Sequence, residues 1–302
     1  MPLKTRDLIN ISPTQPLLVF GGPYSNLAAT QAMRAEAERL AIAPHQIICT
    51  GDVVAYGAEP EETTQAIRDW GIHSIAGNCE EQLAANAADC GCGFDAGSTC
   101  ELLAKGWYPF ANARISSASR AWMGALPRTL RFSYGGLRFL VVHGGVSQTN
   151  RFLFASETAQ LSAELLAANS DVVIAGHSGL PFISRIESHI GPATRNRAIW
   201  FNPGVIGMPA NDGTPDVWYG LITPDSKTGA LTFALRRLSY DFNAAAASLR
   251  RHGHANGYAR TFVTGLWPSL DVLPDAERTV SGVRIKQRSS KLRFIESALT
   301  LS

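Results

Sequence analysis

Short apolar runs that end in glycine or a polar residue recur along the first two thirds of the chain, and they constrain the fold more than any other feature. Six of them occupy residues 17–20, 46–49, 73–76, 139–142, 172–175 and 199–201. Short continuous runs bounded in this way indicate strands that are buried on both faces. Helical periodicity separates the early runs over residues 26–41 and 60–70, and predicts further helices over 117–126 and 156–169. The alternation of strand and helix predicts an α/β protein with a parallel core.

The pattern becomes richer in strands after residue 195. Alternating apolar residues over 217–223 and 231–240 flank a turn of Pro, Asp, Ser, Lys, Thr and Gly, which predicts an antiparallel hairpin. No linker or internal repeat interrupts the chain. We therefore expect a single domain over residues 1–302, with its core at about residues 16–240 and an appended extension of helix and strand over residues 241–302.

Composition excludes several classes of protein. Of the 302 residues, 45% are hydrophobic and 17% are charged, and the formal net charge is +2. This balance excludes disordered and collagen-like chains, and no run of about 18 apolar residues exists to span a membrane. The polar residues 1–15 do not resemble a secretory signal. Five cysteines, an odd number, favour a reducing compartment over a disulfide framework. We expect a soluble cytoplasmic protein without a membrane partner.

A basic segment lies near the end of the chain. Residues 278–294 carry six basic residues and no acidic one. Arg284, Lys286 and Arg288 alternate with Val283 and Ile285, which predicts a charged edge strand that resists pairing with other chains. Nucleic-acid binding is the alternative interpretation, but the segment has no interleaved aromatic residues on which bases could stack. We therefore expect no nucleic-acid partner.

Four polar side chains follow predicted strands at the point where each strand ends. They are Asp52, Asn78, His143 and His177, and each lies beside a glycine. Ligands of open α/β sheets bind at the carboxyl ends of the strands, where the loops meet. A carboxylate, an amide oxygen and two imidazoles suit a divalent manganese, iron or zinc ion. The sequence therefore predicts that these four residues hold a metal ion.

The order of these motifs resembles the calcineurin-like metallophosphoesterases over residues 16–240. That family has a four-layer α/β/β/α sandwich and hydrolyses phosphomonoesters or phosphodiesters with two metal ions. The resemblance implies that Asp52 bridges the metals and that Asn78, His143 and His177 complete the second metal site. The blocks that carry the resemblance are Gly51-Asp52, Gly77-Asn78-Cys79-Glu80, His143-Gly144, Gly176-His177 and Asn202-Pro203-Gly204.

The first metal site of the family is altered in this sequence. Gly22 and Tyr24 stand where family members have the aspartate and histidine of Asp-x-His, and Gly179 replaces the last histidine of Gly-His-x-His. We therefore expect one divalent ion rather than two. Two accounts of the altered site remain open. Either Tyr24 fills the vacated space and hydrogen-bonds Asp52 or a metal-bound water, or the thiols of a glycine-rich segment bind a metal there, namely Cys90, Cys92 and Cys100.

The function that this resemblance implies is metal-dependent hydrolysis of a small phosphorylated substrate. The alternative is a catalytically lapsed member that binds a phosphorylated ligand or a protein partner. Tyr24, Asn26, Cys79 and Arg151 are candidates to orient a phosphate or donate a proton. The expected catalytic residues are Asp52, Asn78, Cys79, His143 and Tyr24.

Overall fold

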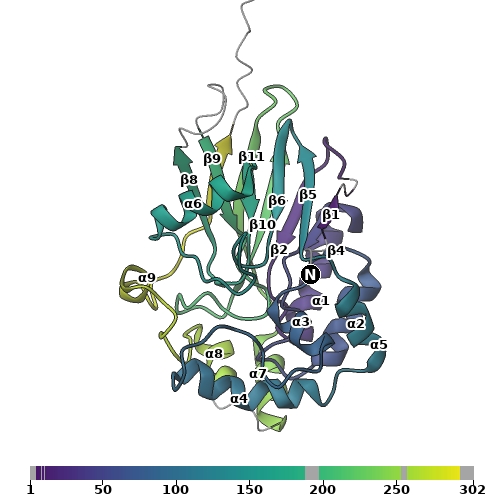
Figure 1. The fold of residues 1–302 in the computed structure, drawn as a ribbon, viewed down its shortest axis with the longest axis vertical. Coiled ribbons are helices and arrows are strands. Elements are labelled where there is room, and N and C mark those ends of the chain that lie inside the picture. The colour runs from purple at the N-terminus through teal and green to yellow at the C-terminus, as the bar shows by residue number, and fades with distance from the viewer. Residues whose placement is uncertain (1–4, 8, 10, 188–196, 253–256, 293–302) are drawn as a thin grey trace, which may run out of the picture.

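The computed structural model describes residues 5–7, 9, 11–187, 197–252 and 257–292. The strands in this part of the chain form two six-stranded mixed sheets (Figure 1). The order of sheet A is β1-β5-β6-β7-β9-β8, and that of sheet B is β12-β11-β10-β2-β3-β4. The strands of sheet A are β1 (Thr5–Asp7), β5 (Thr129–Tyr134), β6 (Leu137–Val141), β7 (Val172–Ile174), β8 (Phe182–Glu187) and β9 (Arg197–Asn202). Those of sheet B are β2 (Leu17–Phe20), β3 (Ile47–Cys49), β4 (His73–Ser74), β10 (Val217–Pro224), β11 (Leu231–Leu238) and β12 (Arg288–Leu292).

The two sheets pack face to face around one apolar core. On β2, Leu17 and Val19 enter the core shared with sheet A, whereas Leu18 and Phe20 point to the opposite face. This alternation follows from the period of two along a strand, and it makes the run apolar throughout because both faces are covered. Strands β2, β3 and β4 are parallel, as are β6, β7 and β9, so the predicted parallel core is confirmed.

Helices cover the outer faces of the two sheets. Met33 of α1 (Leu27–Arg39) and Ile67 of α2 (Pro60–Trp70) pack on the outer face of sheet B. Leu161 of α6 (Thr158–Ala168) packs on the outer face of sheet A with Leu140 and Val173. The result is the α/β/β/α sandwich that the resemblance implied. The predicted helices over 26–41, 60–70, 117–126 and 156–169 are all confirmed, with α5 at Ser117–Ala125.

A further group of helices packs at the carboxyl ends of the parallel strands (Figure 1). Sequence reasoning did not predict two of them, α3 (Asn78–Ala84) and α4 (Thr99–Asn112). The others belong to the extension: α7 (Phe242–His252) and α8 (Tyr258–Thr264). The extension also contains the short helix α9 (Asp275–Thr279), which lies apart from this group and buries none of its residues. None of the described helices is long and apolar enough to cross a membrane.

The edge strand predicted in the basic segment is displaced along the chain. Residues 283–287 form no strand, and β12 begins only at Arg288, where it pairs antiparallel with β11 at the edge of sheet B. The preceding backbone is held differently. The N–H of Ile285 donates to the Asp212 carboxylate over 3.0 Å, and Arg237 donates to the Ile285 carbonyl over 2.7 Å. The hydrogen bonds with Asp212 and Arg237 take the place of the strand pairing that the alternating sequence pattern predicted.

Candidate metal centre

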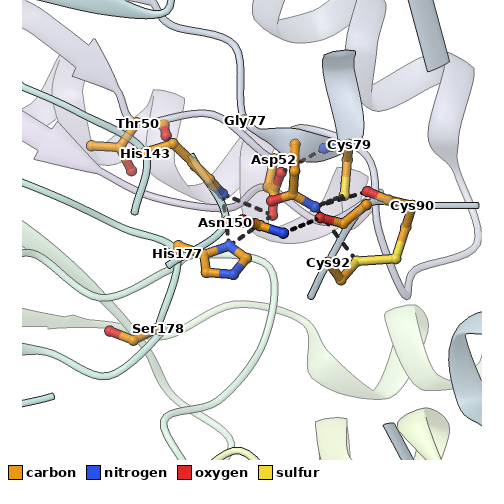
Figure 2. Close-up of polar contacts among 12 residues, drawn as sticks. Thr50, Asp52, Gly77, Cys79, Cys90, Cys92, His143, Asn150, His177 and Ser178 are labelled. Carbon is orange, nitrogen blue, oxygen red and sulfur yellow. Dashed lines mark hydrogen bonds and ion pairs between the residues drawn. A yellow bond between two sulfur atoms is a disulfide. The ribbon is translucent and has the colours of Figure 1, made fainter. Parts of the chain in front are cut away.

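The loops after four strands bring the candidate ligands together between the two sheets. Asp52 follows β3 and Asn78 opens α3 after β4, so both come from sheet B. His143 follows β6 and His177 follows β7, so the two imidazoles come from sheet A. Figure 2 shows Asp52, His143 and His177 pointing toward one another. All four residues are buried.

Three ligand atoms lie at distances that suit one small cation. His143 Nε2 lies 3.2 Å from Asp52 Oδ2 and 2.9 Å from His177 Nδ1. His177 Nδ1 lies 3.9 Å from the same carboxylate oxygen. Two atoms that each lie about 2.1 Å from a tetrahedral zinc ion are about 3.4 Å apart. Asp52, His143 and His177 therefore form a group compact enough to hold one divalent cation.

The tautomer of His143 is set by the backbone of the neighbouring sheet. The carbonyl of Thr50 lies 2.7 Å from His143 Nδ1 and accepts its proton. Without a second proton, the imidazole presents the lone pair of Nε2 toward the carboxylate of Asp52, which is also an acceptor. These two atoms lie 3.2 Å apart, so the site calls for a positive charge between them, supplied either by a proton on Nε2 or by a metal cation. A histidine whose other nitrogen is bound to a carbonyl is the usual arrangement of a metal ligand.

Two buried atoms at this site have no hydrogen-bond partner among the described residues. They are Oδ1 of Asn78 and Nε2 of His177. Asn78 Nδ2 donates to the carbonyl of Cys90 over 2.9 Å, which fixes the amide so that Oδ1 is the free atom. An unsatisfied buried oxygen costs free energy unless a ligand satisfies it. Asn78 thus has the chemistry of a fourth ligand, and that role stays a prediction.

Glu80 holds the loop that carries Asp52, a role that sequence reasoning did not assign to it. Its fully buried carboxylate accepts hydrogen bonds from the backbone N–H groups of Asp52, Val53 and Gly77 over 2.7, 2.8 and 2.9 Å. Burial, followed by the charge of Asp52, raises the pKa of Glu80 to about 7. The sequence signal was a glutamate three residues after the glycine that precedes a helix, which is the spacing of a capping box.

Gly77 is required by the close approach of the ligands. A Cβ atom at this position would lie 2.3 Å from Asp52 Oδ1 and 2.8 Å from His143 Cε1. The neighbouring N–H of Cys79 donates to Asp52 Oδ1 over 3.2 Å, so the second carboxylate oxygen is held by the backbone. Only a glycine allows the chain to pass beside both ligands.

Comparison with known proteins agrees with this geometry. The family model described as "Calcineurin-like phosphoesterase superfamily domain" matches residues 25–227. The chain belongs to this superfamily. An uncharacterized protein of Methanocaldococcus jannaschii is 24% identical over 237 residues, which cover 76% of this chain and 89% of that protein.

Two solved structures are similar to this phosphoesterase fold. A metallophosphoesterase from Sphaerobacter thermophilus is 19% identical, with a TM-score of 0.63, over 84% of this chain and 100% of that one. A hypothetical protein from Pyrococcus horikoshii OT3 is 15% identical, also with a TM-score of 0.63, over 83% of this chain and 99% of that one. These structures confirm the fold and leave the substrate open.

Aromatic rings lie at the positions where the sequence resemblance predicts an altered first metal site. The ring of Tyr24 is buried against Gly22, where an added Cβ would lie 2.4 Å from Tyr24 Cζ. A Cβ on Gly179 would lie 3.6 Å from the indole ring of Trp267. Among the described residues no hydrogen bond joins Tyr24 to Asp52, and a bond from its hydroxyl to a metal-bound water stays a prediction. Burial raises the pKa of Tyr24 well above its ordinary value and keeps the phenol neutral.

The cysteines of the glycine-rich segment do not converge as three thiols. Cys90 and Cys92 form a disulfide across the turn at Gly91, and Cys100 lies apart as a free cysteine. The expectation of reduced cysteines is therefore wrong for this pair, because residues two apart can pair whatever the total number of cysteines. In this state neither sulfur offers a thiolate to a metal. Figure 2 shows the disulfide beside the candidate metal centre.

Two residues expected near a phosphate have structural partners instead. Asn26 caps α1 by accepting from the N–H of Ala29, and its amide donates to the carbonyl of Gly207. Arg151 pairs with the buried carboxylate of Glu164 over 2.6 Å. Cys79 is buried beside Asp52, and burial followed by the charge of Asp52 raises the pKa of its thiol. Its part in proton transfer stays a prediction.

Cation binding should release protons from this centre. Burial lowers the pKa of His143, but the carboxylate of Asp52 outweighs that effect and raises the pKa overall. Because proton and cation compete for Nε2, the apparent affinity for a divalent cation should increase with pH above the ordinary histidine value of about 6.5. Burial and the charge of His143 lower the pKa of His177 to about 3, so this imidazole adds no proton.

Calorimetry in two buffers of different ionisation enthalpy measures this release, with up to about one proton expected from His143 for each cation bound at pH 7. A cation affinity that stays constant between pH 6.5 and 8 would contradict a raised pKa.

Proposed function

We propose that this protein is a metal-dependent phosphoesterase that binds a single divalent cation through Asp52, Asn78, His143 and His177. The observation that supports the proposal best is the 3.2 Å approach of His143 Nε2 to the Asp52 carboxylate, with the opposite nitrogen of the ring bound to a carbonyl. These two buried atoms call for a positive charge between them, and a cation can replace the proton that His143 Nε2 otherwise carries. The superfamily match supports the reaction class.

The residues of the centre would divide the work of hydrolysis. When bound, a divalent cation polarises a phosphoryl oxygen and lowers the pKa of a coordinated water. Asp52 and the two imidazoles would fix the position of the cation and, through it, of the reacting phosphate, and the Cys79 N–H holds the second oxygen of Asp52 in place. Glu80 keeps the Asp52 loop rigid through its backbone bonds. The proposed substrate is a small phosphomonoester or phosphodiester whose phosphate reaches the carboxyl ends of the parallel strands.

The test is metal content measured together with hydrolysis. The purified protein, stripped with a chelator and reloaded separately with manganese, zinc and ferrous iron, should bind one ion per chain. It should then hydrolyse a phosphomonoester or a phosphodiester in proportion to the ion bound. A chain that binds the ion and a phosphate but hydrolyses neither ester would favour the lapsed, ligand-binding alternative.

His177→Ala should lower metal content and hydrolysis together. Even loss of a group that merely supports a ligand weakens metal affinity by about 10- to 100-fold, so loss of the ligand itself should reach the upper end of that range. His45→Ala is the matched control, because His45 is exposed and lies outside the centre. Circular dichroism should show both variants folded. Unchanged stoichiometry in His177→Ala would remove His177 from the ligand set.

A further inference from the structure

An aromatic pocket opens directly beside the candidate metal centre. Six of the side chains that line it are aromatic. It meets the centre at His177, whose imidazole also lies 4.3 Å from the ring of Phe152 between centroids. The six aromatic residues are Tyr24, Tyr56, Phe94, Phe152, Tyr258 and Trp267.

The rings of this pocket are held in place by one another and by the backbone. Tyr56 contacts Tyr24 and Tyr258 with centroid distances of 4.9 and 4.8 Å. Phe94 stacks on Phe152 at 6.1 Å. The indole nitrogen of Trp267 donates to the carbonyl of Pro209 over 2.7 Å, and its backbone N–H donates to Asn211. The walls are thus formed before any ligand arrives.

Away from the candidate metal centre, the side chains that line the pocket are uncharged. Among the described residues that line the pocket there is no aspartate, glutamate, lysine or arginine. The polar groups include the hydroxyls of Ser178 and Ser269, with Ser178 bound by the amide of Asn202. A ligand that occupies both regions therefore has a phosphate at one end and an uncharged, planar, apolar group at the other. Buried aromatic faces favour an aromatic ring in stacked or edge-on contact.

The geometry points to an aryl phosphate ester as the substrate class, with the aryl group of the ester seated between Trp267, Tyr56 and Phe152. This inference rests on the proposed function, because the cation centre supplies the phosphate end of the site. Charged alcohols and esters that carry a second phosphate lack a partner in the pocket, since burying an unpaired charge is costly.

Binding of phosphonates, which are not hydrolysed, tests the pocket separately from catalysis. Calorimetry on the manganese-loaded protein should show phenylphosphonate binding at least about 10-fold tighter than methylphosphonate, as expected for burial of one ring. A 4-carboxyphenylphosphonate should lose that advantage. Equal affinity for the phenyl and methyl compounds would overturn the inference.

Substitutions in the pocket lining test whether the preference for phenylphosphonate over methylphosphonate arises in the pocket. Trp267→Ala should reduce the preference for phenyl over methyl to less than about threefold and leave methylphosphonate affinity unchanged, whereas Trp267→Phe should restore most of the preference. Leu103→Ala, inside the pocket, should reduce the preference as well, and Leu102→Ala is its control because Leu102 is 59% exposed on the same helix. A preference that survives both Trp267→Ala and Leu103→Ala would place the ring elsewhere and overturn the inference.

Hydrolysis then separates the two proposals. Phenyl phosphate should be hydrolysed with a lower KM than glycerol 2-phosphate, and Trp267→Ala should raise that KM with little change in kcat. If phenylphosphonate binds preferentially but no ester is hydrolysed, the proposed function fails and the pocket stands. If both esters are hydrolysed with equal KM and phenylphosphonate shows no preference, the proposed function stands and the pocket assignment fails.

Discussion

Asp52→Asn should reduce phosphoesterase activity by about 10³-fold, which corresponds to about 4 kcal/mol of transition-state stabilisation. Asp52 contributes the only carboxylate among the three clustered side chains. Its loss removes the negative charge that would balance the cation, and an amide oxygen binds divalent cations more weakly than a carboxylate. Metal content should fall in parallel, as measured by elemental analysis after dialysis.

The same substitution should leave the metal-free protein folded and, at a pH above the raised pKa of His143, no less stable. At that pH the imidazole is neutral, and an amide in place of Asp52 can donate a hydrogen bond to its Nε2, which lies 3.2 Å from the carboxylate. Thermal unfolding of the stripped proteins measures this, and Asp95→Asn on the exposed surface is the control. If Asp52→Asn retained full activity, or if it unfolded the stripped protein, the residue would serve packing instead of catalysis.

Gly77→Ala should destabilise the protein by about 2 kcal/mol, within the range for an added methyl group in a packed interior, and should disrupt cation binding. The new Cβ would meet Asp52 Oδ1 at 2.3 Å and the backbone nitrogen of Asp52 at 2.7 Å. Neither atom can move away freely, because the Glu80 carboxylate accepts a hydrogen bond from the backbone N–H of Asp52 and holds it in place. Thermal or urea unfolding, together with metal analysis, measures both effects.

Gly124→Ala provides a control with the opposite expected sign. Gly124 lies within α5, and a Cβ there would meet its nearest neighbour at an ordinary 3.6 Å. Replacing a glycine inside a helix with alanine stabilises by up to about 1 kcal/mol. If both variants had the same stability as the parent chain, the close contact at Gly77 would not constrain the fold.

Local patterns were sufficient to predict the core strands and the grouping of three ligands. The apolar run at residues 17–20 is β2 itself, because a strand covered on both faces excludes polar residues along its whole length. Asp52, His143 and His177 could be predicted because parallel strands deliver their carboxyl ends to one edge.

Long-range partners were beyond the reach of such patterns. The bond between Arg151 and Glu164 depends on how the loop that carries Arg151 folds against α6. Residues 283–287 alternate like a strand, yet Asp212 and Arg237 take their backbone hydrogen bonds. A sequence pattern records which residues are buried or polar, but it does not record which distant group satisfies each one.

Trp267 forms one wall of the pocket, and its position in the chain has a consequence for how substrate selectivity can evolve. The superfamily model matches residues 25–227, and the candidate cation ligands Asp52, His143 and His177 all lie inside that range. Trp267 and its neighbours Pro268, Ser269 and Val272 lie outside it, yet they line the same pocket as His177. Under the two proposals, mutations in the C-terminal segment can change one wall of the pocket, and with it the alcohol group that is accepted, while the candidate metal centre stays intact. Tyr56 and Phe152 line the pocket from inside the matched range, so only part of the selectivity can evolve independently of the chemistry.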